Sequence, residues 1–118
     1  MDKKVIEDRL IDFSVNVTEW VMSKPKHPLV VHLRDQIIRS CTAAALNYGE
    51  AQSAESKKDF IHKIGIVMKE LRETQINLSI LNRFKISSND ERNKNLIKEN
   101  DELLAIFYKT IKTARENL

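Results

Sequence analysis

Glycine and proline are nearly missing from this sequence, with two residues of each among 118. Sheet proteins with many tight turns rely on these residues, so their scarcity argues against a β-rich fold and favours long helices. Cysteine is just as rare. Cys41 is the single one, which excludes a disulfide within the chain and is consistent with a reducing compartment.

Long apolar runs are also missing. No stretch approaches the roughly 18 apolar residues of a membrane-spanning helix, and the opening residues MDKKVIEDRL lack the apolar core of a secretory signal. We therefore expect a cytoplasmic protein with no membrane partner.

Neither sign of charge dominates, because 20 basic and 17 acidic side chains leave a net charge of +3. Such a small surplus gives weak, salt-dependent attraction to polyanions, whereas nucleic-acid-binding domains usually concentrate more charge on one face. Assembly of several subunits would multiply this charge. Nucleic-acid binding therefore stays open beside the alternative of an ordinary solvated surface.

The sequence is rich in apolar residues at helical spacing, and these predict four helices in one domain. The helices are expected over about 3–22, 29–51, 54–84 and 89–116. We expect Asp2 to cap the first helix, Ser53 to cap the third, and Ser88 with Glu91 to form a capping box at the start of the fourth. Short connections between helices of this length predict an all-α, antiparallel, up-and-down four-helix bundle.

The buried stripe of each helix is predicted from residues spaced three and four apart. The first helix has Ile6, Leu10, Phe13, Val17 and Trp20, and the second has Leu33, Ile37, Ser40, Ala44, Asn47 and Ala51. The third has Phe60, Ile64, Val67, Leu71, Thr74, Leu78 and Leu81. The fourth has Ile97, Leu104, Phe107, Ile111 and Ala114, with Asn100 as an odd polar member.

No motif for catalysis or for a cofactor is present. The sequence has no glycine-rich phosphate loop, nucleophile elbow or dinucleotide fingerprint. Asp59 and His62 form half of a di-metal pattern without its second copy, and Cys41 lies among small residues that favour a packed thiol. We expect no enzyme, metal, cofactor or small-molecule substrate.

Polar residues stand at core-like positions of the two middle helices. If these helices fold back near residue 54, Arg39 lies opposite Glu70 and within one turn of Glu73, which predicts an ion pair. We expect a structural polar network that fixes the register of helices or subunits. Its members are Arg39, Ser40, Asn47, Glu50, Glu70, Glu73 and Thr74. An enzyme would instead require Arg39, Asn47, Glu50 and Glu70 to converge on a solvent-filled cavity.

Basic residues form several small groups that are candidate nucleic-acid contacts. Lys109, Lys112 and Arg115 follow one another at three-residue spacing on one predicted face, and no aromatic residues interleave with the basic ones for base stacking. The full set is Lys24, Lys26, Lys57, Lys58, Lys63, Arg83, Lys85, Lys109, Lys112 and Arg115.

A family resemblance runs through the middle of the chain. It is carried by Gln36-Ile37-Ile38-Arg39-Ser40, by Asn47-Tyr48-Gly49-Glu50-Ala51, by Lys58-Asp59-Phe60-Ile61-His62-Lys63 and by Lys69-Glu70-Leu71-Arg72-Glu73-Thr74. This pattern resembles the bacterial four-helix bundle proteins that are also called 23S rRNA-intervening sequence proteins. Length and helix layout extend the resemblance over nearly the whole chain.

The resemblance implies a left-handed up-and-down bundle that assembles as a homopentamer. Members of this family look like relatives of the accessory variability protein of diversity-generating retroelements, which partners a reverse transcriptase and binds nucleic acid. The family's recurring positions match the seven residues of the predicted polar network. The leading hypothesis is thus a non-enzymatic oligomeric scaffold that contacts RNA, DNA or a nucleic-acid-handling partner such as a reverse transcriptase. The alternative is a protein–protein interaction module with no nucleic-acid binding.

Overall fold

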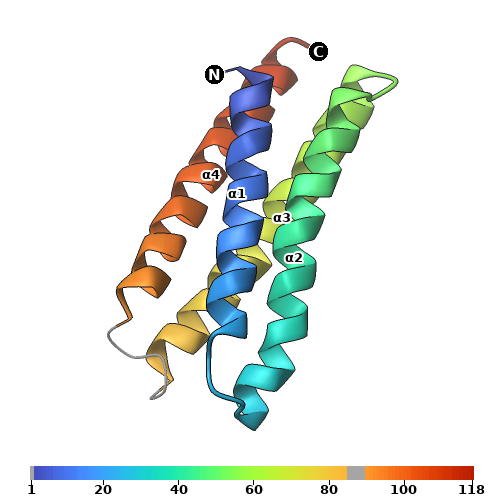
Figure 1. Cartoon of the computed structure of the whole chain (residues 1–118). Helices are drawn as coiled ribbons and strands as arrows, with labels where there is room; N and C mark the ends of the chain where they lie inside the picture. The colour runs from blue at the N-terminus through green and yellow to red at the C-terminus, as the bar shows by residue number, and fades with distance from the viewer. Residues whose placement is uncertain (1, 85–89) are drawn as a thin grey trace.

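The protein is all-α, with four long helices and no strand in the part of the chain that the structure describes, residues 2–84 and 90–118 of a computed structural model (Figure 1). The helices are α1 (Lys3–Met22), α2 (Pro28–Gln52), α3 (Lys57–Arg83) and α4 (Glu91–Glu116). Their Cα atoms fill a body of 47 × 20 × 20 Å. The predicted all-α, four-helix fold is confirmed.

Neighbouring helices pack side by side around a ring, in the pairs α1–α2, α2–α3, α3–α4 and α4–α1. Figure 1 shows both chain ends and the α2–α3 connection at one end of the bundle, and the α1–α2 connection at the other. The last turns of α4 and the first turns of α3 therefore share the end at which the chain begins and finishes. No helix in the described part of the chain combines the length and the apolar character that a membrane span requires.

Local capping explains where the helices begin. The Asp2 carboxylate accepts the Lys4 amide at 3.0 Å, so α1 starts as predicted. Ser53 does not cap α3, because it lies at the C-terminal cap of α2, and Ser56 accepts the Asp59 amide at 3.1 Å instead. The sequence prediction started α3 at about residue 54 rather than at Lys57, because it chose Ser53 instead of Ser56 as the cap.

The start of α4 also differs from the prediction. Asp90 is its N-cap, accepting the amides of Arg92 at 2.9 Å and Asn93 at 3.3 Å through one carboxylate oxygen. Its other oxygen accepts the indole N–H of Trp20 at 2.7 Å and a hydrogen bond from Lys24. The predicted cap Ser88 lies outside the described residues. A carboxylate suits this position because it also meets the positive end of the helix dipole.

The predicted stripe of α1 is buried throughout, whereas α2 and α3 each have one predicted member only half-buried: Asn47 on α2 and Phe60 on α3. On α4 the predicted stripe is right at Asn100 and Phe107 and wrong at its other members, because Ile97, Leu104, Ile111 and Ala114 are only half-buried at the core's edge. The buried residues of α4 are Asn93, Leu96, Asn100, Leu103 and Phe107. Two asparagines interrupt this stripe, so in the sequence the neighbouring row of Ile97, Leu104 and Ile111 is more continuously apolar and was predicted as the buried one.

Hydrogen bonds to backbone carbonyls accommodate these buried asparagines. The side-chain amide of Asn100 donates to the Leu71 carbonyl of α3 at 3.0 Å, and that of Asn93 donates to the Leu78 carbonyl at 3.1 Å. Asn77 of α3 donates in the same way to the Leu33 carbonyl of α2 at 3.3 Å. The α2–α3 and α3–α4 interfaces are thus mostly apolar, and each contains at least one side-chain hydrogen bond between its two helices.

Candidate nucleic-acid interface

The predicted polar network contains one hydrogen-bonded buried pair, and its other five residues are spread along α2 and α3. Ser40 of α2 and Thr74 of α3 are both buried, and their hydroxyl oxygens are 2.6 Å apart. Ser40 also reaches the Ile37 carbonyl and Thr74 the Glu70 carbonyl. Each hydroxyl has one proton, so the pair either donates from Ser40 through Thr74 to the Glu70 carbonyl or runs in the opposite direction.

The predicted ion pair of Arg39 is not formed among the described residues. Arg39 and Glu73 are exposed and line a groove of about 320 Å³ between α2 and α3. The reason is the rotation of the two helices, which places Ser40 and Thr74 on the contact line and turns Arg39 and Glu73 toward solvent. Asn47 instead donates to the Ala43 carbonyl of its own helix at 2.9 Å.

Two carboxylates of the set have different surroundings. Glu50 contacts Lys63 of α3 at 3.8 Å near the end of α2, away from the groove that holds Arg39. Glu70 is buried. Burial raises the pKa of its carboxyl, the charge of Glu73 adds to this rise, and Arg39 and Lys69 oppose it. Arg39, Asn47, Glu50 and Glu70 therefore do not line one common cavity in the described part of the molecule.

The side chains that could serve as a nucleophile or as metal ligands are either buried or not clustered in the described part of the chain. Burial raises the pKa of the Cys41 thiol to about 11, although hydrogen bonding to Ser14 lowers it somewhat. A thiol that stays protonated at neutral pH is a poor nucleophile. Within residues 2–84 and 90–118, no three side chains of His, Cys, Asp or Glu come together as a metal site.

Several of the predicted basic contacts are already engaged within the subunit. Lys24 pairs with Asp90 and lies 5.0 Å from the centroid of the Trp20 ring, so its charge is largely enclosed. Lys63 pairs with Glu50, and Lys57 donates to the Asn117 carbonyl at 3.0 Å. The remaining candidates Lys26, Lys58, Arg83, Lys109, Lys112 and Arg115 are exposed, and Lys85 lies outside the described residues.

The three basic residues of α4 do not share one face. A step of three residues turns a helix by about 300°, so each successive side chain is displaced by about 60°. Lys109 accordingly lines a groove toward α1 and the start of α3, whereas Lys112 and Arg115 line a different groove against α3.

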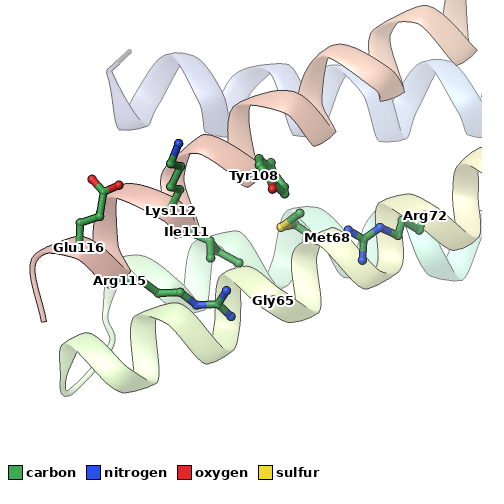
Figure 2. A pocket seen from close by; sticks show the side chains of 8 residues that line it. All are labelled: Gly65, Met68, Arg72, Tyr108, Ile111, Lys112, Arg115 and Glu116. Atoms are coloured by element: carbon green, nitrogen blue, oxygen red, sulfur yellow. The ribbon is translucent and has the colours of Figure 1, made fainter.

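The groove between α3 and α4 brings cations together with an exposed aromatic ring. Its volume is about 590 Å³, within the range of about 300–1,000 Å³ that is typical of ligand sites. Figure 2 shows its lining, with Arg115 extending from α4 toward Gly65 of α3 and Arg72 beside Met68. The lining residues are Gly65, Met68, Arg72, Tyr108, Ile111, Lys112, Arg115 and Glu116.

The charge in this groove is mostly uncompensated. Arg72, Lys112 and Arg115 supply three positive charges against the single carboxylate of Glu116. None of the three cations has a side-chain hydrogen bond or ion pair with another residue in the described ranges. Lys58 lies seven residues before Gly65, on the same face of α3, and is also exposed. The groove can therefore attract an anion without first breaking an internal ion pair.

The sequence prediction missed the aromatic part of this site. Tyr108 is 66% exposed and lies four residues before Lys112 and seven before Arg115, so an aromatic ring does interleave with the basic residues. Arg72 was missed as a contact, and it lies seven residues after Gly65. The signal was present in both helices, because Gly65 and Arg72 share one face of α3 and Tyr108, Lys112 and Arg115 share one face of α4. Finding the groove required pairing these two faces.

Comparison with known proteins agrees with this architecture. Residues 3–109 match the family described as 23S rRNA-intervening sequence protein. A crystal structure of a protein with unknown function from the S23 ribosomal protein family of Bacteroides thetaiotaomicron superposes with a TM-score of 0.79 and 26% sequence identity, covering 91% of this chain and 98% of the other. No curated protein matches the sequence.

Proposed function

Because the chain belongs to the family of 23S rRNA-intervening sequence proteins, we propose that it is a non-enzymatic cytoplasmic scaffold that contacts nucleic acid through the α3–α4 groove. The observation that carries this proposal is a set of three cations, Arg72, Lys112 and Arg115, that form no ion pair within the described part of the chain and lie beside one carboxylate. The family's name refers to ribosomal RNA, which supports RNA as the first ligand to test. A nucleic-acid-handling protein such as a reverse transcriptase would be a partner of the same assembly.

The second part of the proposal is assembly into a homopentamer of left-handed, antiparallel up-and-down bundles. Large apolar side chains on the outer surface of α2 and α3 support a subunit contact there. Leu46 is 69% exposed and Ile76 is 62% exposed, and Ile80 follows one turn after Ile76. Each subunit would then add its own basic groove, so the attraction to a polyanion would grow with the number of subunits.

Light scattering tests the assembly directly. The expected result at micromolar concentration is a particle of about five times the 13.7 kDa chain mass. A monomer under these conditions would overturn the assembly part of the proposal.

A salt titration of RNA and DNA binding tests the contact. Replacing Arg72, Lys112 and Arg115 with glutamine should weaken binding and reduce the slope of log K against log salt by about 2, at about 0.7 for each phosphate contact to a single strand. The control variant replaces Lys26, Arg83 and Lys98, which are exposed elsewhere, and changes the net charge equally. Equal weakening by both variants would show diffuse attraction and reject the groove, while no binding at low salt would remove nucleic acid from the proposal.

The exposed apolar side chains also favour the second candidate, a protein–protein interaction module. Leu46 and Ile76 would then contact a different protein rather than another subunit. A pull-down that recovers one stoichiometric protein partner, together with no affinity for nucleic acid, would support this function over the first.

A further inference from the structure

The floor of the α3–α4 groove is open because of a glycine that packing does not require. Beyond its chain neighbours and the backbone of its own helical turn, a Cβ atom added at Gly65 would meet no atom within 4 Å, and the residue lies well inside α3. Glycine disfavours a helix interior, so its presence here works against the helix without relieving any steric clash. Its physical effect is to leave a space against Met68 and Ile111, between the two helices.

A flat, exposed aromatic ring lies in the same groove. Tyr108 is exposed over most of its surface, and Figure 2 shows it on the α4 side of the groove near Met68, with Arg72 on the α3 side and Arg115 farther along α4. The groove thus offers apolar and aromatic surface in its middle and guanidinium groups at two places along its length. A chain of alternating flat apolar rings and anionic groups matches this order of surfaces.

We propose that the groove binds a single-stranded segment of nucleic acid by taking up one unpaired base over Gly65 against Tyr108, a proposal that rests on the nucleic-acid contact proposed above. Arg72, Lys112 and Arg115 contact the phosphates on either side of that base. Bases in a duplex are paired and stacked on one another, so they cannot enter the groove. Stacking on an aromatic ring accepts any base, and the site therefore has little sequence preference.

The experiment compares a fluorescein-labelled RNA of about ten nucleotides with a blunt duplex of the same sequence, by fluorescence anisotropy at low salt. The wild-type protein should bind the single strand more tightly than the duplex. Tyr108→Leu should lose roughly 5- to 150-fold in affinity for the single strand, the range expected when one base loses its stacking partner. Tyr108→Phe keeps the ring and should keep the affinity.

A pair of glycine variants tests the space itself. Gly65→Leu fills the groove without changing charge and should reduce single-strand affinity at least as much as Tyr108→Leu. Gly49→Leu is the matched control, since Gly49 also lies inside a helix with no atom within 4 Å of an added Cβ, but on α2 beside Glu50. Leucine favours helix over glycine, so both variants should fold, which circular dichroism checks.

The outcomes separate this inference from the function on which it rests. Full single-strand affinity in either Tyr108→Leu or Gly65→Leu, or equal losses in Gly65→Leu and Gly49→Leu, overturns the base-binding groove. If the glutamine variant of Arg72, Lys112 and Arg115 still abolishes binding in that case, the proposed nucleic-acid contact stands and only the single-strand inference is lost. If the wild-type protein binds neither RNA at low salt, the proposed function fails first.

Discussion

Replacing Asp90 with asparagine should destabilise the bundle more than any other change of a single carboxylate to an amide. One oxygen of Asp90 caps α4, and the other accepts hydrogen bonds from Trp20 of α1 and from Lys24 of the α1–α2 connection. An asparagine amide has only one oxygen. Whichever way it turns, its NH₂ group faces either the amides of the first turn of α4 or the donors of Trp20 and Lys24.

The size of the effect follows from the acidity of the carboxyl. Burial would raise the pKa of Asp90, but the hydrogen bonds from Lys24 and Trp20 and from the Asn93 amide lower it to about 2, from an ordinary value of 3.8. At about 1.4 kcal/mol for each pH unit, this difference corresponds to about 2 kcal/mol of stability for the ionised form. Asp90→Asn should therefore lower the free energy of unfolding by about 2 kcal/mol at pH 7.

The stabilisation by ionised Asp90 should depend on pH in one direction. Because the pKa is lower in the folded state, the stabilisation is complete above about pH 4 and is lost as the pH falls toward 2. Urea unfolding followed by circular dichroism, at one fixed protein concentration, should show a gap of about 2 kcal/mol between the wild type and Asp90→Asn at pH 7. That gap should shrink as the pH approaches 2, where the wild-type carboxyl is itself becoming protonated.

Asp8→Asn is the matched control, since Asp8 is exposed and pairs with Lys4 at 3.3 Å on the surface of α1. Exposed pairs of this kind contribute about 0–1 kcal/mol, so this variant should unfold close to the wild type at every pH. A gap for Asp90→Asn below about 0.5 kcal/mol at pH 7, or a gap of constant size down to pH 2, would refute the reasoning.

Three further predictions concern the interior. Glu70→Gln should raise the melting temperature at pH 7, because the raised pKa of Glu70 means that folding opposes its ionisation; the gain should vanish as the pH falls below about 4, where the wild type is protonated in both states. In a double-mutant cycle of Ser40→Ala and Thr74→Val, chemical unfolding should give a coupling energy of about 0.5–1.5 kcal/mol, whereas additive losses would mean that the two hydroxyls do not interact. Cys41 should react with a thiol reagent at pH 8 only after unfolding in urea, and rapid reaction of the folded protein would contradict its burial.

The sequence predicted the helices well because apolar spacing reports directly on which side of a helix is buried. It predicted α1 to the residue, and it assigned Ser40 and Thr74 to the buried stripes of their helices, where the structure joins them by a hydrogen bond. It placed Asn100 and Phe107 correctly in the buried stripe of α4 but missed Asn93, Leu96 and Leu103, because a polar residue such as Asn93 looks like a surface residue until its partner on α3 is known. No pattern within one helix reveals a carbonyl on another.

The candidate site could be predicted only in part for the same reason. The basic residues Lys112 and Arg115 were recognised, but the groove depends on the pairing of α4 with α3. Gly65 and Tyr108 become meaningful only when that pairing brings both into the lining of one groove. The ion pair expected for Arg39 is absent among the described residues because the sequence pattern identifies which helices pair but not how far each is rotated about its axis.

The asparagines that donate to carbonyls of a neighbouring helix have a consequence for how the bundle responds to mechanical load. If α4 slid along α3 by one turn, Asn93 and Asn100 would lose their hydrogen bonds to the Leu78 and Leu71 carbonyls, and a buried amide without a partner costs free energy. An apolar interface alone resists such sliding weakly, since one row of leucines fits another nearly as well after a shift. The amide hydrogen bonds therefore oppose sliding of α4 along α3. Under a pulling force we expect the helices to unfold from their ends and separate, rather than to slide past one another.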